Sequence, residues 1–194
     1  MNSPFRKLVR IAVVLLAAVL LFNFFGYYMI HLSSKQNEKM VKLVNISGQQ
    51  QTLCQLITKD VMLLTKGNLP EPEYQAIREQ LRSATDSFIS GNQLLRDKIK
   101  IVKDEPVTND LLEITRDLTN AQTHVKAIIA VAREVFQADS QLLAINGALY
   151  KQQILYSERK FYPLMDEVVQ RYTGVVTDRM EESSTINTSK FISL

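Results

Sequence analysis

The chain has 194 residues, with 23 lysines and arginines against 20 aspartates and glutamates, which gives a net charge of +3. This small excess does not indicate nucleic-acid binding, and the length allows about one domain beside a membrane segment. The single cysteine, Cys54, excludes an intramolecular disulfide. The only histidines, His31 and His124, are too far apart in sequence to suggest a metal site. The chain has no Trp and few Gly and Pro residues, a composition that favours long helices.

The run Ile11–Ile30 is about 20 residues long and carries no charge. At about 1.5 Å per residue it covers roughly 30 Å, which is the hydrocarbon thickness of a bilayer. It is too long for a signal-peptide core and no small-residue cleavage site follows, so we predict an uncleaved single-pass anchor. Three basic residues between positions 6 and 10 favour a cytoplasmic N-terminus, although Lys35, Lys39 and Lys42 follow the span. Residues 1–31 should therefore be a cytoplasmic stub and anchor, with the rest outside the cytoplasm.

The first helix after the anchor is predicted over residues 35–66. One face follows the alternating three–four spacing of a packed helix, at positions 40, 43, 47, 50, 54, 57, 61 and 64. This stripe is apolar at both ends and polar in the middle. Gly67 and Pro70 then end the helix, because Gly suits a left-handed cap and Pro cannot continue the helix.

Two more helices are predicted over 72–102 and from about residue 110 onward, joined by a connection that contains Pro106. The earlier helix has an interruption at Ser90-Gly91-Asn92. Its stripe is Tyr74, Ile77, Leu81, Ala84, Phe88 and Leu95. The later helix has an unbroken stripe, namely Leu111, Ile114, Leu118, Ala121, Val125, Ile128, Ala132 and Val135.

A less regular segment over 139–156, interrupted at Asn146-Gly147, precedes a last helix that is predicted to begin near Pro163. The stripe of this last helix is Phe161, Met165, Val168, Tyr172 and Val175. No stripe continues past Glu182, so residues 185–194 should be a frayed tail. Amphipathic stretches joined by short turns favour an all-α antiparallel four-helix bundle over residues 32–184. An extended coiled coil is the alternative.

The sequence contains no pattern that indicates an enzyme, a metal site or a cofactor: it has no Gly-rich phosphate loop, metal-ligand cluster or nucleophile elbow. Carboxylates such as Asp60, Asp86, Asp117 and Asp166 are interpreted as solvated helix residues. The unusual feature is the polar run Asn45–Lys59 inside a helix that should bury an apolar stripe.

Five residues of this run are candidate ligand contacts: Asn45, Ser47, Gly48, Gln51 and Gln55. Gly48, Gln51 and Gln55 follow one side of a helix at one-turn intervals. Gly48 lacks a side chain, which lets a ligand or a second helix approach, and the two amides both donate and accept hydrogen bonds. The alternative interpretation is a solvated face or a layer that sets pairing register.

The run Asn45–Lys59 resembles the signature of the sensory domain of type IV pilus methyl-accepting chemotaxis transducers and of the related nitrate/nitrite sensor histidine kinases. That signature reads roughly Asn-x-Ala/Ser-Gly-x-Gln-Arg-Met-x-Ser-Gln-Arg. The residues that match are Asn45, Ser47, Gly48, Gln50 and Gln55. A weaker match is Phe161–Tyr172, which is similar to the opening of the family's last helix. The resemblance covers about residues 35–182 and implies a four-helix sensory bundle.

Two departures from the family change what the resemblance implies. Two arginines hold the anion in the nitrate sensors, but the matching residues here are Gln51 and Leu56, so nitrate binding is not implied. A neutral polar ligand, or amide pairing across a dimer, fits these residues instead. The family's last helix also normally leads to a second span and a transmitter, so this chain is expected to be either a truncated receptor or a stand-alone sensor with a downstream partner.

Together these features predict a single-pass protein of a bacterial inner membrane whose periplasmic bundle serves chemotaxis or two-component signalling. It is expected to form a homodimer through the first bundle helix and to bind a small polar ligand. The alternative is a membrane-anchored structural or adaptor bundle without a ligand.

Overall fold

The computed structural model describes the backbone of residues 4–67, 69–102 and 109–192, and the side chains of residues 12–28, 31, 34–35, 38–67, 69–97 and 109–178. The helices are α1 (Pro4–Leu64), α2 (Glu71–Val102), α3 (Asn109–Gln137) and α4 (Ser140–Ile192). This part of the chain contains no strand, which confirms the all-α prediction. The predicted connection with Pro106 lies outside the described residues.

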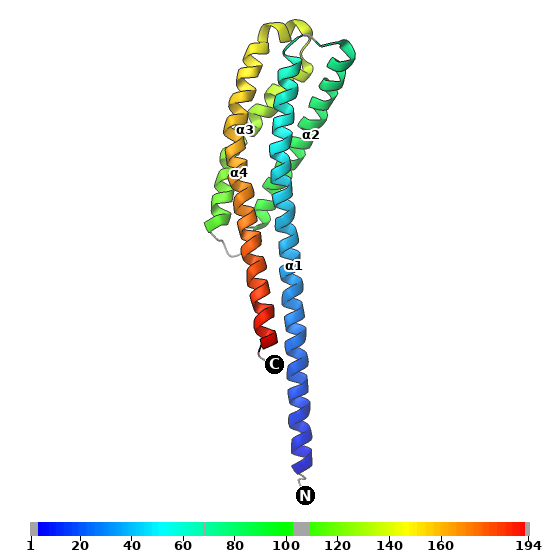
Figure 1. Cartoon of the computed structure of the whole chain (residues 1–194), viewed down its shortest axis with the longest axis vertical. Helices are drawn as coiled ribbons and strands as arrows, with labels where there is room; N and C mark the ends of the chain where they lie inside the picture. Colours follow the sequence, from blue (N-terminus) through cyan, green and yellow to red (C-terminus); the bar gives the residue numbers. More distant parts are fainter. Residues whose placement is uncertain (1–3, 68, 103–108, 193–194) are drawn as a thin grey trace. The chain divides into compact units, whose positions relative to one another are not determined.

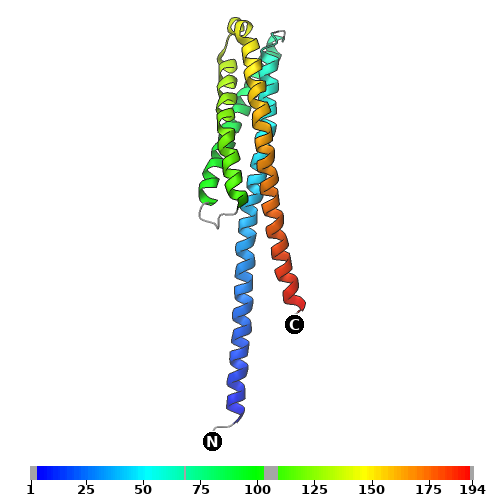
Figure 2. The same cartoon turned by 90° about the vertical axis from the view of Figure 1, so that its left-hand side faces the viewer.

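The chain divides into two compact units, one formed by Met1–Met40 with Thr177–Leu194 and the other by Val41–Val176. In the larger unit the helices pack as a helical bundle, and consecutive helices run in opposite directions (Figures 1 and 2). Ring contacts join helices across it: Phe88 of α2 meets Phe161 of α4 edge-on at 5.4 Å between centroids, and His124 of α3 meets Tyr156 of α4 at 6.3 Å.

The predicted stripes form most of the core of the larger unit. The seven α1 stripe positions in this unit are buried, from Leu43 to Leu64, and so are all eight of α3, from Leu111 to Val135; the remaining α1 position, Met40 in the smaller unit, is buried as well. The five predicted positions of α4 are buried as well, and in α2 only Tyr74 is half-buried. The three–four spacing therefore identified the inward faces, because a packed helix buries the same side over successive turns.

α4 is one helix, whereas the sequence predicted an irregular segment followed by a separate last helix. Pro163 lies inside α4, but its side chain is exposed while Phe161 and Met165 on either side are buried. Water can satisfy the carbonyl that Pro163 leaves without a donor, and the flanking core contacts hold the helix. Gly147 also lies inside α4, and a Cβ at this position would lie 3.2 Å from the Thr65 carbonyl oxygen. This glycine permits close packing instead of forming a break.

The connections between helices are short where the structure describes them. α3 and α4 are joined by two residues, Ala138 and Asp139, and the Asp139 carboxylate accepts a hydrogen bond of 2.8 Å from the Leu142 backbone N–H. This is a standard N-terminal cap. Gly67, after α1, has a φ of 80°, as predicted for a left-handed helix end. The backbone of α4 is helical through Ile192, past the predicted end of its stripe at Glu182, since no Gly or Pro follows Gly174.

In the smaller unit, residues 12–25 of the uncharged run of α1 are all exposed to solvent. For example, Leu16 is 62% exposed, Leu21 70% and Phe24 73%. Within the residues that the structure describes, no helical stretch has the length and apolar character needed to cross a membrane. The predicted span Ile11–Ile30 extends beyond this part, because the side chains of residues 11, 29 and 30 are not among those described.

Candidate functional site

The five predicted ligand residues do not converge on one point. Ser47 is fully buried in the core, Asn45 and Gln55 are exposed, and Gly48 and Gln51 are half-buried. Gly48 has open space where a side chain would stand, since a Cβ there would meet no atom within 4 Å. Of these five residues, only Ser47 lies in the core as a whole, and the amide nitrogen of the half-buried Gln51 is buried without a hydrogen-bond partner among the described residues.

The buried amide of the run is Gln50, and its partner is Asn92 of α2. Gln50 is 1% exposed, and the Asn92 Nδ2 atom donates hydrogen bonds to Gln50 Oε1 and to the Phe88 carbonyl oxygen, the latter at 2.9 Å. A Cβ at Gly91 would overlap Gln50 Nε2 and lie 3.0 Å from Gln50 Cδ. The interruption Ser90-Gly91-Asn92 is therefore the part of α2 that accommodates the Gln50 amide. The gap between Phe88 and Leu95 in the α2 stripe was the sequence signal for this pairing.

Two carboxylates that the sequence assigned to solvated helix faces are buried. Asp60 of α1 is fully buried and Asp117 of α3 is 3% exposed, whereas Asp86 is exposed as predicted. Each of the two buried residues directly precedes a core residue, Val61 or Leu118. The buried face of a bundle helix is wider than a single line of stripe positions, and it includes these neighbours.

The Asp60 carboxylate has neither oxygen in a hydrogen bond within the described structure, and the Lys59 Nζ atom lies 3.6 Å from Oδ1. Burial raises the pKa of Asp60, and the nearby ammonium of Lys59 opposes this effect only in part. The hydroxyls of Ser47 and Thr58 on the same helix are also buried without hydrogen-bond partners among the described residues. The inward face of α1 therefore contains polar groups that its neighbours do not fully satisfy.

Asp117 belongs to a cluster of acidic and basic side chains between α3 and α4. Arg171 forms an ion pair with Glu113, and its Nε atom lies 3.5 Å from Asp117 Oδ2. The Arg116 Nε atom lies 3.5 Å from the other Asp117 oxygen. These contacts join the two helices and compensate the buried charge, which indicates a structural role.

Cys54 is the other group whose chemistry is altered by burial. Its side chain is fully buried, and this burial raises the pKa of the thiol to about 12, with the negative charge of Glu158 acting in the same direction and a contact with Thr58 opposing it. A thiol that remains protonated at neutral pH is a poor nucleophile and a poor metal ligand. Among the described residues, no group of three or more His, Cys, Asp or Glu is placed to hold a metal ion.

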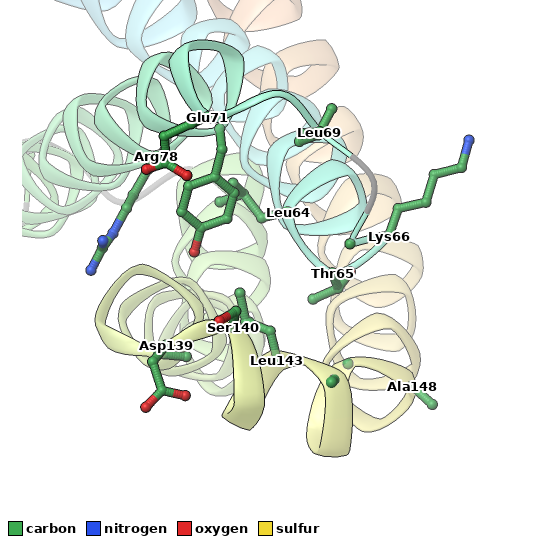
Figure 3. Close-up of a pocket in the computed structure, with 15 residues that line it drawn as sticks. Leu64, Thr65, Lys66, Leu69, Glu71, Arg78, Asp139, Ser140, Leu143 and Ala148 are labelled. Carbon is green, nitrogen blue, oxygen red and sulfur yellow. The ribbon is translucent and has the colours of Figure 1, made fainter.

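A cavity of about 590 Å³ lies where the α1–α2 and α3–α4 connections meet (Figure 3). Its size is within the range of small-molecule sites. The end of α1 contributes Leu64, the start of α2 contributes Glu71 and Arg78, and the start of α4 contributes Leu143 and Ala144. None of the five predicted ligand residues lines it.

The cavity wall combines apolar side chains with fixed charges. The Arg78 Nε atom donates a hydrogen bond of 2.8 Å to the Phe136 carbonyl oxygen, and the guanidinium lies 5.2 Å from the Phe136 ring centroid. Glu71 accepts a 2.7 Å hydrogen bond from Gln75. Figure 3 shows Lys66 extending away from the other labelled side chains. The wall therefore contains one held cation, Arg78, and two carboxylates, Glu71 and Asp139, which suits a small polar ligand.

Comparison with known proteins found no family, no curated protein and no solved structure that matches this chain.

Proposed function

We propose that this chain is a membrane-anchored, extracytoplasmic sensory module that binds a small polar ligand in the cavity at the helix connections. One observation carries the proposal. The cavity wall includes Leu64, the last residue of α1, and α1 is an uninterrupted helix from there back to Pro4. A change at the cavity would therefore act on the same helix that contains the uncharged run. The resemblance of Asn45–Lys59 to chemotaxis and nitrate sensor domains supports the same class of function.

The exposed run of α1 supports a bilayer anchor. Its apolar side chains are exposed on successive residues, and therefore all around the helix, as Leu20, Leu21 and Phe22 illustrate at 62%, 70% and 68%. A single docking partner covers one side of a helix, whereas lipid covers every side. The basic residues near the N-terminus support a cytoplasmic N-terminus, with the larger unit in the periplasm of a bacterium.

The proposed mechanism is a small displacement of α1 against its neighbours when the ligand binds. The inward face of α1 favours such a displacement, because it contains Ser47, Thr58 and Asp60 without hydrogen-bond partners in the described structure. The α3 stripe is apolar throughout, and the buried carboxylate beside it, Asp117, has the guanidinium groups of Arg116 and Arg171 within 3.5 Å. Polar groups with incomplete pairing hold a helix in one position less strongly than a closely packed apolar stripe does. A downstream partner or transmitter would receive the displacement.

Thermal unfolding of the full chain in detergent micelles, with amino acids, dicarboxylates and sugars as probes, tests this function. A ligand present at 100 times its Kd should stabilise the folded chain by about 2.7 kcal/mol. Ala144→Trp, at an exposed residue of the cavity wall, should abolish the gain in melting temperature. Ala76→Trp, at an exposed residue of α2 that is not part of the wall, should leave the gain intact. If no probe raises the melting temperature, or if both variants respond equally, the ligand site is wrong.

A second candidate function is a membrane-anchored adaptor without a ligand. The observation that favours it is the pairing of Gln50 with Asn92 inside the bundle, since a buried amide pair fixes helix register without any ligand. An adaptor would keep its melting temperature in the presence of every probe.

A further inference from the structure

The first five turns of α4 carry a second apolar stripe that is partly exposed to solvent. Leu142 is 42% exposed, Ile145 76%, Leu149 50% and Tyr156 60%. These four residues, the outer α4 stripe, are spaced by three, four and seven positions and therefore share one side of the helix. The buried side of the same segment consists of other residues, including Leu143, Tyr150 and Ile154.

The segment Ser140–Tyr150 contains no charged side chain. The outer side of α1, which the sequence predicts as the dimer interface, is different: its exposed residues include Asn45, Thr52, Gln55 and Lys59. Depletion of charge and enrichment in large apolar side chains are features of the centre of a protein interface. By this measure the outer α4 stripe resembles an interface more closely than the outer side of α1 does.

We infer that the outer α4 stripe is the surface through which a second copy of this chain docks, with the two α4 helices parallel about a two-fold axis. The inference rests on the membrane anchor of the proposed function, because anchors in one bilayer hold both copies in the same orientation. In a two-fold pair each residue near the axis meets its own counterpart. A charged face would repel its copy, whereas the uncharged segment Ser140–Tyr150 does not. The three–four spacing of Leu142, Ile145 and Leu149 is the spacing of a coiled-coil seam.

The area of the stripe explains why the anchor is needed. Its four side chains expose roughly 400 Å² per copy, about half of the ~800 Å² per partner that a stable interface buries. Free copies would therefore pair weakly, whereas copies confined to one membrane are at high effective concentration. Ala144 and Ala148 of the same segment line the cavity. Pairing and ligand binding therefore involve the same turns of α4.

Disulfide cross-linking of the full chain in phosphatidylcholine vesicles tests the inference. Cys54→Ser removes the only cysteine, and Ile145→Cys then introduces one on the stripe. Thr52→Cys reports pairing through α1, and Gln80→Cys, at an exposed residue of α2, reports random collision. Under mild oxidation, Ile145→Cys should yield at least about ten times more linked dimer than either control. Adding Leu149→Glu should abolish this excess, and because Leu149 is half exposed the melting temperature should stay close to that of the parent.

Every other pattern of linkage overturns the inference. Preferential linkage of Thr52→Cys would place the interface on α1, equal linkage of all three variants would indicate collision, and no linkage would indicate a monomer. Flotation of the chain with the vesicles measures the anchor separately. A chain that floats without linking refutes the stripe alone, whereas a chain that does not float refutes the anchor and the parallel pairing together.

Discussion

Gly91→Ala should destabilise the bundle, although alanine is the better helix former. In an open helix this change stabilises by about 1 kcal/mol. At Gly91 the added Cβ would overlap the side-chain amide of Gln50, which is 1% exposed and accepts a hydrogen bond from Asn92. The overlap is with the Nε2 atom at the end of the Gln50 side chain, and moving this amide also moves the Oε1 atom that accepts the hydrogen bond from Asn92.

The magnitude follows from the groups that are left unpaired. Removing the partner of a buried polar group costs about 1–3 kcal/mol, and this exceeds the gain in helix propensity. Gly91→Ala should therefore lower the free energy of unfolding by about 1 kcal/mol. Gly48→Ala is the matched control, because its Cβ would meet no atom within 4 Å, and it should raise the free energy of unfolding by about 1 kcal/mol.

The assay is thermal unfolding of the full chain followed by circular dichroism, where a contrast of about 2 kcal/mol corresponds to roughly 4–8 °C for a chain of this size. A double-mutant cycle isolates the cause. In a Gln50→Ala background the overlap is gone, so Gly91→Ala should become stabilising. If Gly91→Ala stabilises the parent chain as much as Gly48→Ala does, the buried position of the Gln50 amide is refuted.

Three further predictions concern single buried residues. Asp60→Asn should stabilise the chain at pH 7 by about 1–3 kcal/mol, because the buried carboxylate has a raised pKa and its charge opposes folding. This gain should shrink as the pH falls through the folded pKa and vanish below about pH 3, where Asp60 is protonated in both the folded and the unfolded state; melting curves across this range that keep a constant gain would contradict the prediction. Val125→Asp should cost several kcal/mol and abolish the cooperative melting transition, whereas an unchanged curve would exclude Val125 from the core. Cys54 should react with a maleimide at pH 7.5 only after unfolding in urea, since its thiol is buried with a pKa of about 12; rapid reaction of the folded chain would show that Cys54 is accessible.

The inward faces could be predicted from the sequence because they depend on spacing alone. The stripes of α1 and α3 repeat every three or four residues, and every predicted position from Met40 to Leu64 and from Leu111 to Val135 is buried. The continuity of α4 could not be predicted in the same way. Pro163 and Gly147 have low helix propensity, and only contacts with other helices, which a single sequence does not reveal, show that the helix continues through them.

The candidate site was less accessible to prediction. Gln50 lies on the predicted stripe of α1, but its pairing with Asn92 depends on the register between two helices, which neither helix specifies alone. Asp60 was misinterpreted because a carboxylate next to a stripe is usually solvated. The cavity is built by two connections about 70 residues apart in the chain, so no local motif marks it.

The two-residue connection between α3 and α4 has a consequence for the order of folding. The entropy lost on closing a loop increases with its length, so Ala138 and Asp139 join their helices at a lower entropic cost than residues 65–70 join α1 to α2. Pairs of helices with short connections have low contact order and form early. The α3–α4 hairpin should therefore be the nucleus, and α1, with its incompletely paired polar groups, should join last. Mutations in α3 would then slow folding, whereas those on the inward face of α1 would mainly accelerate unfolding.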